Sequence, residues 1–151
     1  MDLEERIEKM DKRLERLFKK HPVCQKIAEV PGVGVLTATA ILAAVSSPHV
    51  FQNGRHMAAW LGLVPRQHSS GGKEKLGRLS KWGNRYLRTL LIHGGRAVVR
   101  HAEKKKDSQS VWTNKLRNRR GNNIAAVAIA NKNARVIWAL LAHDEDYRTA
   151  A

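Results

Sequence analysis

Apolar residues recur at helical spacing along most of this chain, and no segment alternates apolar and polar residues with the sustained period of two that a half-buried strand needs. At 151 residues the chain is long enough for one domain with a buried core. The expected fold class is therefore all-α, a compact helical domain. The spacing predicts helices over 2–20, 23–29, 35–45, 54–61, 111–119 and 124–142, with another that Ser80 caps.

Basic residues dominate the middle of the chain. Lys and Arg number 28 against 13 Asp and Glu, a net charge of +15. Nine of the acids lie at 2–15 and 144–146, whereas 66–120 holds 16 basic residues and three acids. Such a field attracts a polyanion, and salt-dependent attraction to phosphates would supply most of the affinity. The alternatives are a basic surface kept for solubility and an acidic membrane surface, although glycines interrupt the basic stretch and it has no bulky apolar face.

Several classes of protein are excluded by composition. Cys24 is the single cysteine, so no internal disulfide forms, and no Cys/His group has zinc-site spacing. The three scattered acids of the middle are too few for a two-metal nuclease. The N-terminus lacks the layout of a secretory signal, and the longest apolar run, 33–45, is too short to span a bilayer. We expect a soluble, cytoplasmic protein without a metal or cofactor of its own.

The first helix carries a coiled-coil pattern. Leu3, Ile7, Met10, Leu14 and Leu17 follow the alternating spacing of four and three that defines an a/d seam. Two and a half heptads are few for an independent dimer, so two interpretations stay open: packing on its own domain, or pairing with another chain. The helix can also be the end of a longer one, because the pattern is in full register from Met1.

A Pro-Gly-Val-Gly turn over 31–34 joins two helices within 23–45 and resembles a helix-hairpin-helix motif. Gly32 and Gly34 permit a tight turn, and the N–H groups at the start of the second helix can hold a DNA phosphate without reading sequence. A plain helical hairpin without a ligand is the alternative.

A Gly/Ser-rich segment over 65–78 is interpreted as a functional loop. Ser69 and Ser70 lie within it among many cations. A serine can attack a phosphate when its proton leaves and positive groups hold the phosphate. The alternative is a loop that binds phosphate without breaking a bond. His68 is a proton acceptor by adjacency only, and phosphate contact is its other role.

The helix after this segment is expected to turn Tyr86 and Leu87 toward a core and its arginines toward solvent or phosphate. Gly94-Gly95 in its middle is a weak point or a close-contact site. The residues predicted to contact DNA phosphates are Gly32, Gly34, Arg66, His68, Lys73, Lys75, Arg78, Lys81, Arg85 and Arg88.

The run 59–73, followed by 77–81 and 83–88, resembles the C-terminal transposase domain of the insertion-sequence "one-ten" transposases, especially their "eleven-eleven" subgroup. The turn at 31–34 lies where that family has its own helix-hairpin-helix-like segment. The resemblance runs from about Val30 to His101, roughly half of the chain.

The resemblance implies transposition by a two-part enzyme. In that family an N-terminal RuvC-like domain carries Asp/Glu metal ligands for Mg²⁺, and a serine of the C-terminal domain attacks a DNA phosphate to form a phosphoserine link. The family's serine position corresponds to Ser70, with Ser69 as the substitute. The implied partners are DNA and a noncoding guide RNA, with a homo-oligomer expected and no membrane.

The RuvC-like domain is absent from this sequence, so we expect a fragment that is inactive by itself. The family's coiled-coil linker resembles 1–21, and the transposase domain is expected over 22–143, with a tail over 144–151. Two other functions stay open: a non-catalytic helix-hairpin-helix module that grips nucleic acid, and an oligomerisation element built on the first helix.

Overall fold

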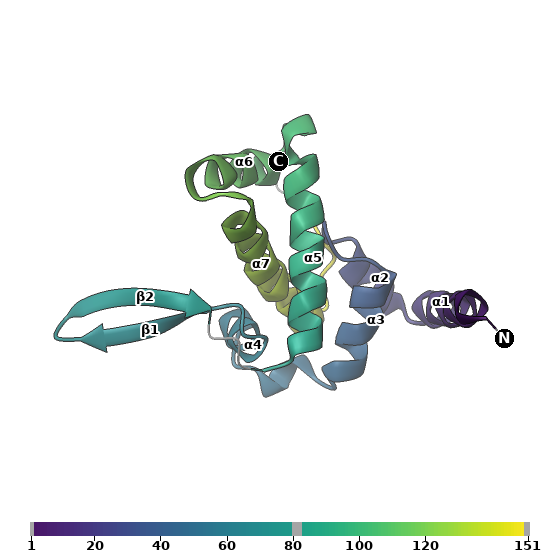
Figure 1. Ribbon diagram of the computed structural model, residues 1–151. Coiled ribbons are helices and arrows are strands. Elements are labelled where there is room, and N and C mark those ends of the chain that lie inside the picture. Colours follow the sequence, from purple (N-terminus) through teal and green to yellow (C-terminus); the bar gives the residue numbers. More distant parts are fainter. Residues whose placement is uncertain (1, 80–82, 150–151) are drawn as a thin grey trace.

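The structure, a computed structural model, describes residues 2–79 and 83–149, and at 67–70 and 74–76 it describes the backbone alone. The predicted all-α class is confirmed, with one small two-stranded sheet beside the helices (Figure 1). The elements are α1 (Leu3–Lys20), α2 (Pro22–Ala28), α3 (Val35–Ala44), η1 (Pro48–Val50), α4 (Gly54–Trp60), β1 (Pro65–Ser70), β2 (Lys73–Leu79), α5 (Arg85–His101), η2 (Ala102–Lys104), α6 (Ser108–Arg120) and α7 (Asn122–His143).

Helix α7 is the centre of the core, because it contacts α5, α4, α6 and α2. The faces of α7 that point into the core carry small and branched side chains, and Ala126, Ile129 and Ile137 among them are buried. Of the helices in the described part of the chain, α7 alone is long and apolar enough to cross a bilayer. Its packing on four neighbours and its buried Asn133 are typical of the core helix of a globular domain.

Two adjacent glycines let α5 approach two backbones at once. A Cβ built on Gly94 would lie 1.9 Å from the carbonyl oxygen of Gly32, and one on Gly95 would lie 2.3 Å from that of Ala126 in α7. Both distances are below any real Cβ contact, so only glycine fits at either position. Gly94-Gly95 is therefore a close-contact site and not a weak point of the helix.

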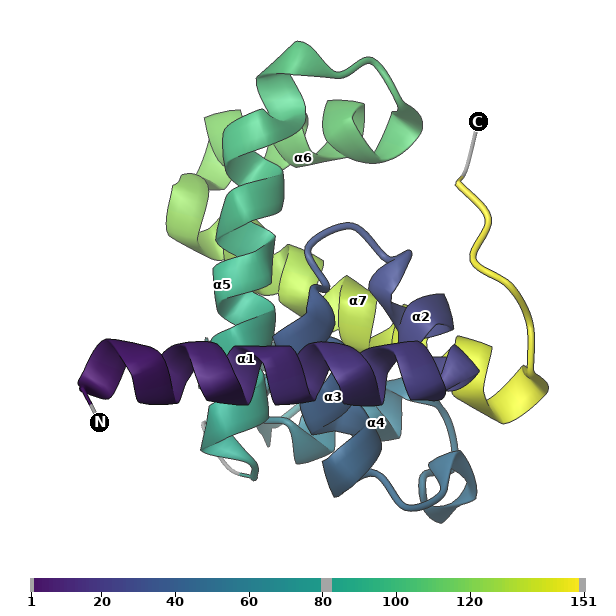
Figure 2. The same ribbon diagram turned by 90° about the vertical axis from the view of Figure 1, so that its right-hand side faces the viewer.

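Helix α1 forms as the spacing predicts, with Asp2 as its N-cap, and it lies against α3 and α2 (Figure 2). None of its residues is buried. Phe18 packs against the core and Leu14 is half-buried, whereas the other seam residues, Leu3, Ile7, Met10 and Leu17, are 42–65% exposed. Packing on its own domain thus accounts for the C-terminal part of α1 only.

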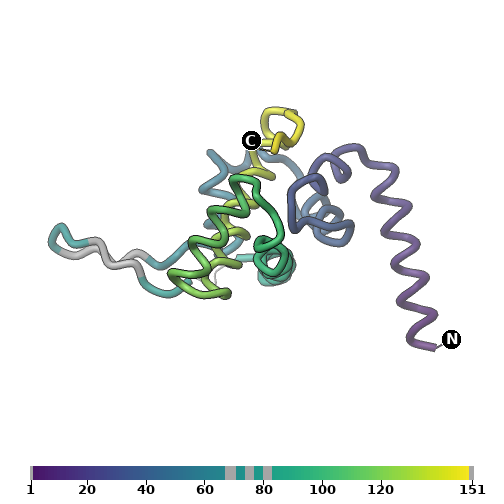
Figure 3. Tube along the Cα trace, turned by 90° about the horizontal axis from the view of Figure 1, so that it is seen from above, coloured from purple at the N-terminus to yellow at the C-terminus, as the bar shows by residue number. Residues whose placement is uncertain are grey.

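Segment 65–78, which the sequence predicts as a loop, is a β-hairpin (Figure 1). Gly71 and Gly72 have φ of +61° and +78°, the left-handed values that a two-residue hairpin turn needs. The period-two pattern is missing because Arg66, Gln67, His68, Ser69 and Ser70 are all polar, so neither face stands out. The hairpin projects from the helical body at the end opposite to α1 (Figure 3).

The start of α5 also differs from the expectation. The helix begins at Arg85, and the Asn84 side chain caps it by accepting from the Leu87 N–H at 3.0 Å. Ser80, the expected cap, lies outside the described residues. Asn53 caps α4, accepting from the His56 N–H at 2.9 Å.

Candidate functional site

The register of the hairpin separates the two serines. Ser70 pairs with Lys73 and His68 with Lys75, whereas Ser69 pairs with Glu74. Because directly paired positions, and positions two apart along a strand, share one face of a ribbon, positions 68, 70, 73 and 75 fall on one face. Positions 67, 69, 74 and 76 fall on the other. The pairing thus groups position 70 with the positions of two lysines and a histidine, and position 69 with that of an acid.

The N-terminal base of the hairpin is tied to the helical body through backbone carbonyls. Arg88 Nη1 in α5 donates to the Leu61 carbonyl at 3.3 Å, and Asn131 Nδ2 in α7 donates to the Leu63 carbonyl at 3.1 Å. Leu61 and Leu63 are both buried. These bonds fix the direction in which the chain leaves α4 and enters β1.

The other side of the base is fixed by a close backbone contact. Gly83, four residues after β2 ends, has φ +93°, and a Cβ built on it would lie 1.6 Å from the Trp60 carbonyl oxygen. The chain therefore returns to the body beside the point where it left. The segments before β1 and after β2 therefore both lie next to the C-terminal end of α4.

Arg88 departs from its predicted role. It was expected to face solvent or phosphate, but it is only 9% exposed and its guanidinium is engaged with the Leu61 carbonyl. Its neighbour Tyr86, predicted to face the core, is 56% exposed. Leu87 and Leu91 are both buried, and with α5 in that orientation position 88 also faces the core. Arg88 is thus a positioning residue for the hairpin base.

Four of the other predicted cations are exposed around the hairpin and the start of α5: Arg66, Lys73, Arg78 and Arg85. For His68, Lys75, Ser69 and Ser70 the structure gives backbone position alone, and Lys81 lies outside the described residues. Of the predicted set, the fold thus places Arg66, Lys73, Arg78, Arg85 and the backbone of positions 68 and 75 on or beside one projecting ribbon.

The turn that joins α2 and α3 lies elsewhere on the body. Gly32 has φ +89° and packs against Gly94 of α5. Gly94 lies nine residues into that helix, about 14 Å along it. The turn is therefore packed against α5 at Gly32. Asn133 Nδ2, on α7, donates to the Pro31 carbonyl at 2.8 Å and holds the same turn. Gly34 is exposed at the N-cap of α3, and no side chain among the described residues caps that helix. Gly32 has a structural role here, whereas Gly34 stays open to a ligand.

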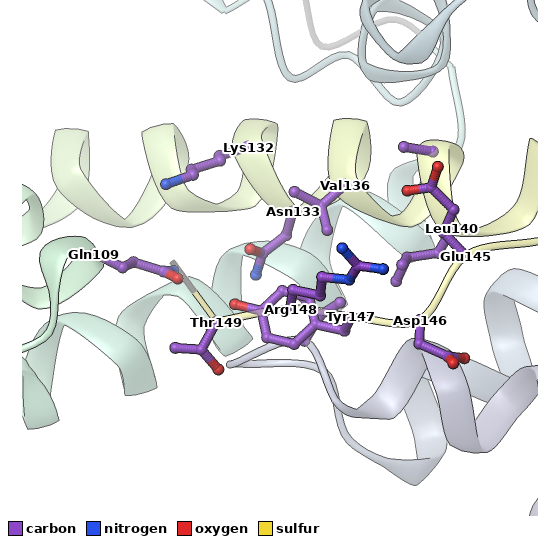
Figure 4. A pocket seen from close by; sticks show the side chains of 12 residues that line it. Gln109, Lys132, Asn133, Val136, Leu140, Glu145, Asp146, Tyr147, Arg148 and Thr149 are labelled. Carbon is purple, nitrogen blue, oxygen red and sulfur yellow. The ribbon is translucent and has the colours of Figure 1, made fainter. Parts of the chain in front are cut away.

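A cavity of about 410 Å³ lies away from these residues, between α7 and segment 144–149 (Figure 4). Asn133, Val136 and Tyr147 line it, and Lys26 in α2 holds the segment through Asp144 at 2.8 Å. That hydrogen bond lowers the pKa of Asp144 and raises the pKa of Lys26. None of the predicted site residues whose side chains the structure describes lines this cavity, so it is the space left where the C-terminal segment packs on α7.

Two asparagines that hold this arrangement were not predicted from the sequence. Asn131 and Asn133 lie with Lys132 and Arg135 in a polar stretch that interrupts a mostly apolar helix, and that interruption is the signal that could have marked them. Amides that packing removes from water need partners, and both half-buried Asn131 and buried Asn133 donate to carbonyls of distant segments.

Comparison with known proteins identifies the class to which this fold and hairpin belong. Residues 24–110, more than half of the chain, match the family model described as "Transposase IS116/IS110/IS902 family". The chain belongs to that transposase family, as the resemblance predicted.

Individual relatives agree. The chain is 49% identical over its whole length to the "Transposase for insertion sequence element IS1111A" of Coxiella burnetii, of which it covers 42%. It is 48% identical, over 97% of its length, to a "Probable family 20 transposase" of Pseudomonas aeruginosa, of which it covers 43%. A "Pilin gene-inverting protein" of Moraxella bovis is 35% identical over 44% of the chain and is covered to 21%. The chain thus spans less than half the length of the curated relatives it matches.

Proposed function

We propose that this chain is the DNA-binding and serine-nucleophile half of a transposase, with Ser70 as the nucleophile. The observation that carries the proposal is the hairpin register, which groups position 70 with positions 68, 73 and 75 and groups Ser69 with Glu74. Positive groups beside a serine stabilise both its alkoxide and the charge that develops on an attacked phosphate, whereas an acid repels both. Family membership supports the same assignment.

The proposed step is a transesterification that needs no oxidant or reductant. The Ser70 oxygen attacks the phosphorus of a DNA phosphodiester, a P–O bond to serine forms, and the P–O bond to one deoxyribose breaks. The serine proton passes, directly or through a base, to the deoxyribose oxygen that leaves. A second deoxyribose hydroxyl then attacks the phosphoserine, which restores the serine hydroxyl and joins the strands.

The exposed cations around the ribbon, Arg66, Lys73, Arg78 and Arg85, are proposed to hold the phosphates that flank the attacked one. Lys75, Lys81 and His68 complete this set by position in the sequence. The hydrogen bonds from Arg88 and Asn131 fix the direction of the hairpin, and its turn stays exposed, where a nucleic-acid duplex can reach it.

The Mg²⁺ that the resemblance implies does not fit the residues present. No three His, Cys, Asp or Glu side chains gather within 2–79 and 83–149 where side chains are described. We assign that metal to the RuvC-like domain that the resemblance implies, outside this chain, and derive no step through it.

Three further proposals concern partners. A noncoding guide RNA is proposed to bind beside DNA, because both present the same phosphate charge to a +15 chain. A second copy is proposed to pair through α1, whose seam residues Leu3, Ile7, Met10 and Leu17 are exposed at coiled-coil spacing. The third proposal is action on DNA in the bacterial cytoplasm, which the names and bacterial sources of the relatives support.

The proposal is tested with Ser70→Ala and Ser69→Ala in a full-length transposase that carries this chain. Supercoiled donor DNA is incubated with each protein, and covalent protein–DNA adducts are measured on a denaturing gel. Ser70→Ala should lose the adduct and strand exchange while its DNA affinity stays unchanged, and Ser69→Ala should keep all three. An adduct that survives Ser70→Ala contradicts the nucleophile assignment.

A non-catalytic module that grips phosphate through the α2–α3 turn is the second candidate, favoured by the exposed Gly34 at the uncapped start of α3. In that case a side chain at Gly34 would obstruct the ligand. Because a Cβ there meets nothing within 4 Å, Gly34→Val is expected to keep the fold, and unchanged thermal melting would confirm that the variant isolates binding. Weaker DNA binding by Gly34→Val, together with an adduct that survives in Ser70→Ala, would favour this function.

A further inference from the structure

A second group of basic residues lines a groove at the other end of α5. The groove has a volume of about 390 Å³ and is lined by Arg96, Arg100, Arg117, Asn122, Asn123 and Val99. Three elements meet there: the last two turns of α5, the last turn of α6 and the first turn of α7. Arg96 and Arg100 are exposed, as expected for the arginines of this helix, but none of the three arginines is among the residues predicted to contact DNA phosphates.

Two of the three arginine charges in this groove, those of Arg96 and Arg100, are uncompensated. Arg96 and Arg100 are one helical turn apart on α5, both are exposed, and neither has an ion pair or a side-chain hydrogen bond in the described part of the chain. Like charges at this spacing destabilise a helix. The nearby acid, Glu103, bonds to Arg117 and fixes its guanidinium. Among the residues that the structure describes, no acid lines the groove.

From these features we propose that the groove binds the sugar-phosphate backbone of a nucleic-acid duplex, as a contact separate from the serine hairpin. Two unpaired guanidiniums with bidentate geometry suit phosphate oxygens, and two asparagine amides add neutral donors. This inference rests on the proposed function only in taking nucleic acid as the ligand, and it requires no role for Ser70.

The lining residues favour a backbone over a base or a free nucleotide. None of them is aromatic, so there is no surface on which a base would stack. Exposed Arg119 and Arg120 continue the positive charge past the groove along the end of α6. A continuous row of phosphates matches such a strip better than a single small anion does.

The position of the groove makes the contact separate in space. Arg96 and Arg100 lie 11 and 15 residues beyond Arg85, which at the rise of an α-helix is about 17–22 Å from the hairpin end of α5. In Figure 1 the hairpin leaves the lower end of α5, and α6 lies at the upper end. A duplex held in the groove therefore contacts phosphates that the hairpin does not reach.

The test measures binding of the 151-residue chain to a DNA duplex, an RNA duplex and a DNA single strand of equal length, over a range of salt. Arg96→Gln/Arg100→Gln should weaken duplex binding about tenfold or more and lower the salt slope by about two units. The matched control is Arg13→Gln/Arg16→Gln, which removes the same charge from exposed positions of α1 and should change binding much less. All four arginines are exposed, and unchanged thermal melting confirms that the variants fold.

The arms of the experiment identify the ligand. Loss on the DNA duplex or on the RNA duplex supports the groove and tells which of them it holds. Equal losses in the groove variant and the control, or a loss as large on the single strand as on either duplex, overturn the proposal. Ser70→Ala serves as the independent arm: if adduct formation fails to depend on Ser70 but duplex binding depends on the groove, the proposed function falls and this inference stands.

Discussion

Different interactions stabilise the β1–β2 hairpin and the helical body. The body is held by interdigitated apolar side chains around α7 and by backbone contacts that admit only glycine. The hairpin has polar residues along β1 and is defined by a two-glycine turn at one end and by carbonyl anchors at the other. The candidate chemistry thus lies on the part with the least packing, and its aim depends on buried residues in the part with the most.

Glycines on the two sides of this boundary illustrate the difference. Gly83 and Gly71 both have positive φ, but a Cβ would overlap the Trp60 carbonyl at Gly83 and would meet nothing within 4 Å at Gly71. Gly71 is needed for conformation alone, whereas Gly83 is needed for conformation and space.

The largest effect on stability is expected at this pair. Gly83→Ala should cost about 3 kcal/mol or more in the free energy of unfolding, because a backbone clash adds to an unfavourable φ. Gly71→Ala should cost about 1 kcal/mol, the conformational part alone. Urea denaturation of both variants measures the difference. Equal costs would mean that the hairpin base is not pinned against α4.

A smaller loss is expected inside α5. An exposed helical Gly→Ala change normally stabilises by about 0.5–1 kcal/mol, but Gly94→Ala should destabilise by about 1–3 kcal/mol because its Cβ would meet the Gly32 carbonyl. Thr89→Ala, at an exposed position of the same helix, should stay within about 0.5 kcal/mol. Thermal melting distinguishes them, and a stabilised Gly94→Ala would contradict the close contact.

Arg88 links the two regions, so its removal should affect both. Arg88→Leu leaves the buried Leu61 carbonyl without that donor, at a cost of about 1–3 kcal/mol. Amide hydrogen exchange should rise in β1 and β2 more than in α7. Arg85→Leu, an exposed change on the same helix, should leave exchange in the hairpin unaltered. A uniform rise across the whole chain in Arg88→Leu would show a general packing defect and no specific anchor.

The smallest effect concerns the C-terminal segment and pH. The hydrogen bond to Lys26 lowers the pKa of Asp144 below its ordinary 3.8, so the stabilisation is present above that value and is lost as pH falls through the lowered pKa. The same hydrogen bond raises the pKa of Lys26 above its ordinary 10.5, so the stabilisation is also lost as the pH rises through that raised pKa. Proteolysis of 144–149 should therefore increase below about pH 3.8, and Asp144→Asn should show the same increase at neutral pH. A pH-independent segment would contradict the role of this pair.

The sequence predicted the body well, because burial follows helical periodicity. Local sequence predicts each of the seven α-helices in the described residues but neither 3-10 helix, and a close contact is one of the two roles predicted for Gly94-Gly95. The hairpin was missed because its strand residues are polar on both faces, which removes the contrast that periodicity needs.

The misassigned site residue has a different cause. Arg88 shares the charge and spacing of its exposed neighbours, and the carbonyl that it binds lies 27 residues earlier in the chain. No local pattern encodes such a partner. The same holds for the groove at Arg96 and Arg100, which exists only because the ends of α5, α6 and α7 meet.

The central claim, that Ser70 becomes covalently joined to DNA, is tested most directly by locating the link. The adduct formed by the full-length transposase is digested with nuclease and protease, and the peptide spanning 67–73 is sequenced by tandem mass spectrometry. The claim predicts a nucleotide whose phosphate is esterified to the Ser70 oxygen. A modified Ser69, or an adduct on a peptide outside the hairpin, would contradict it.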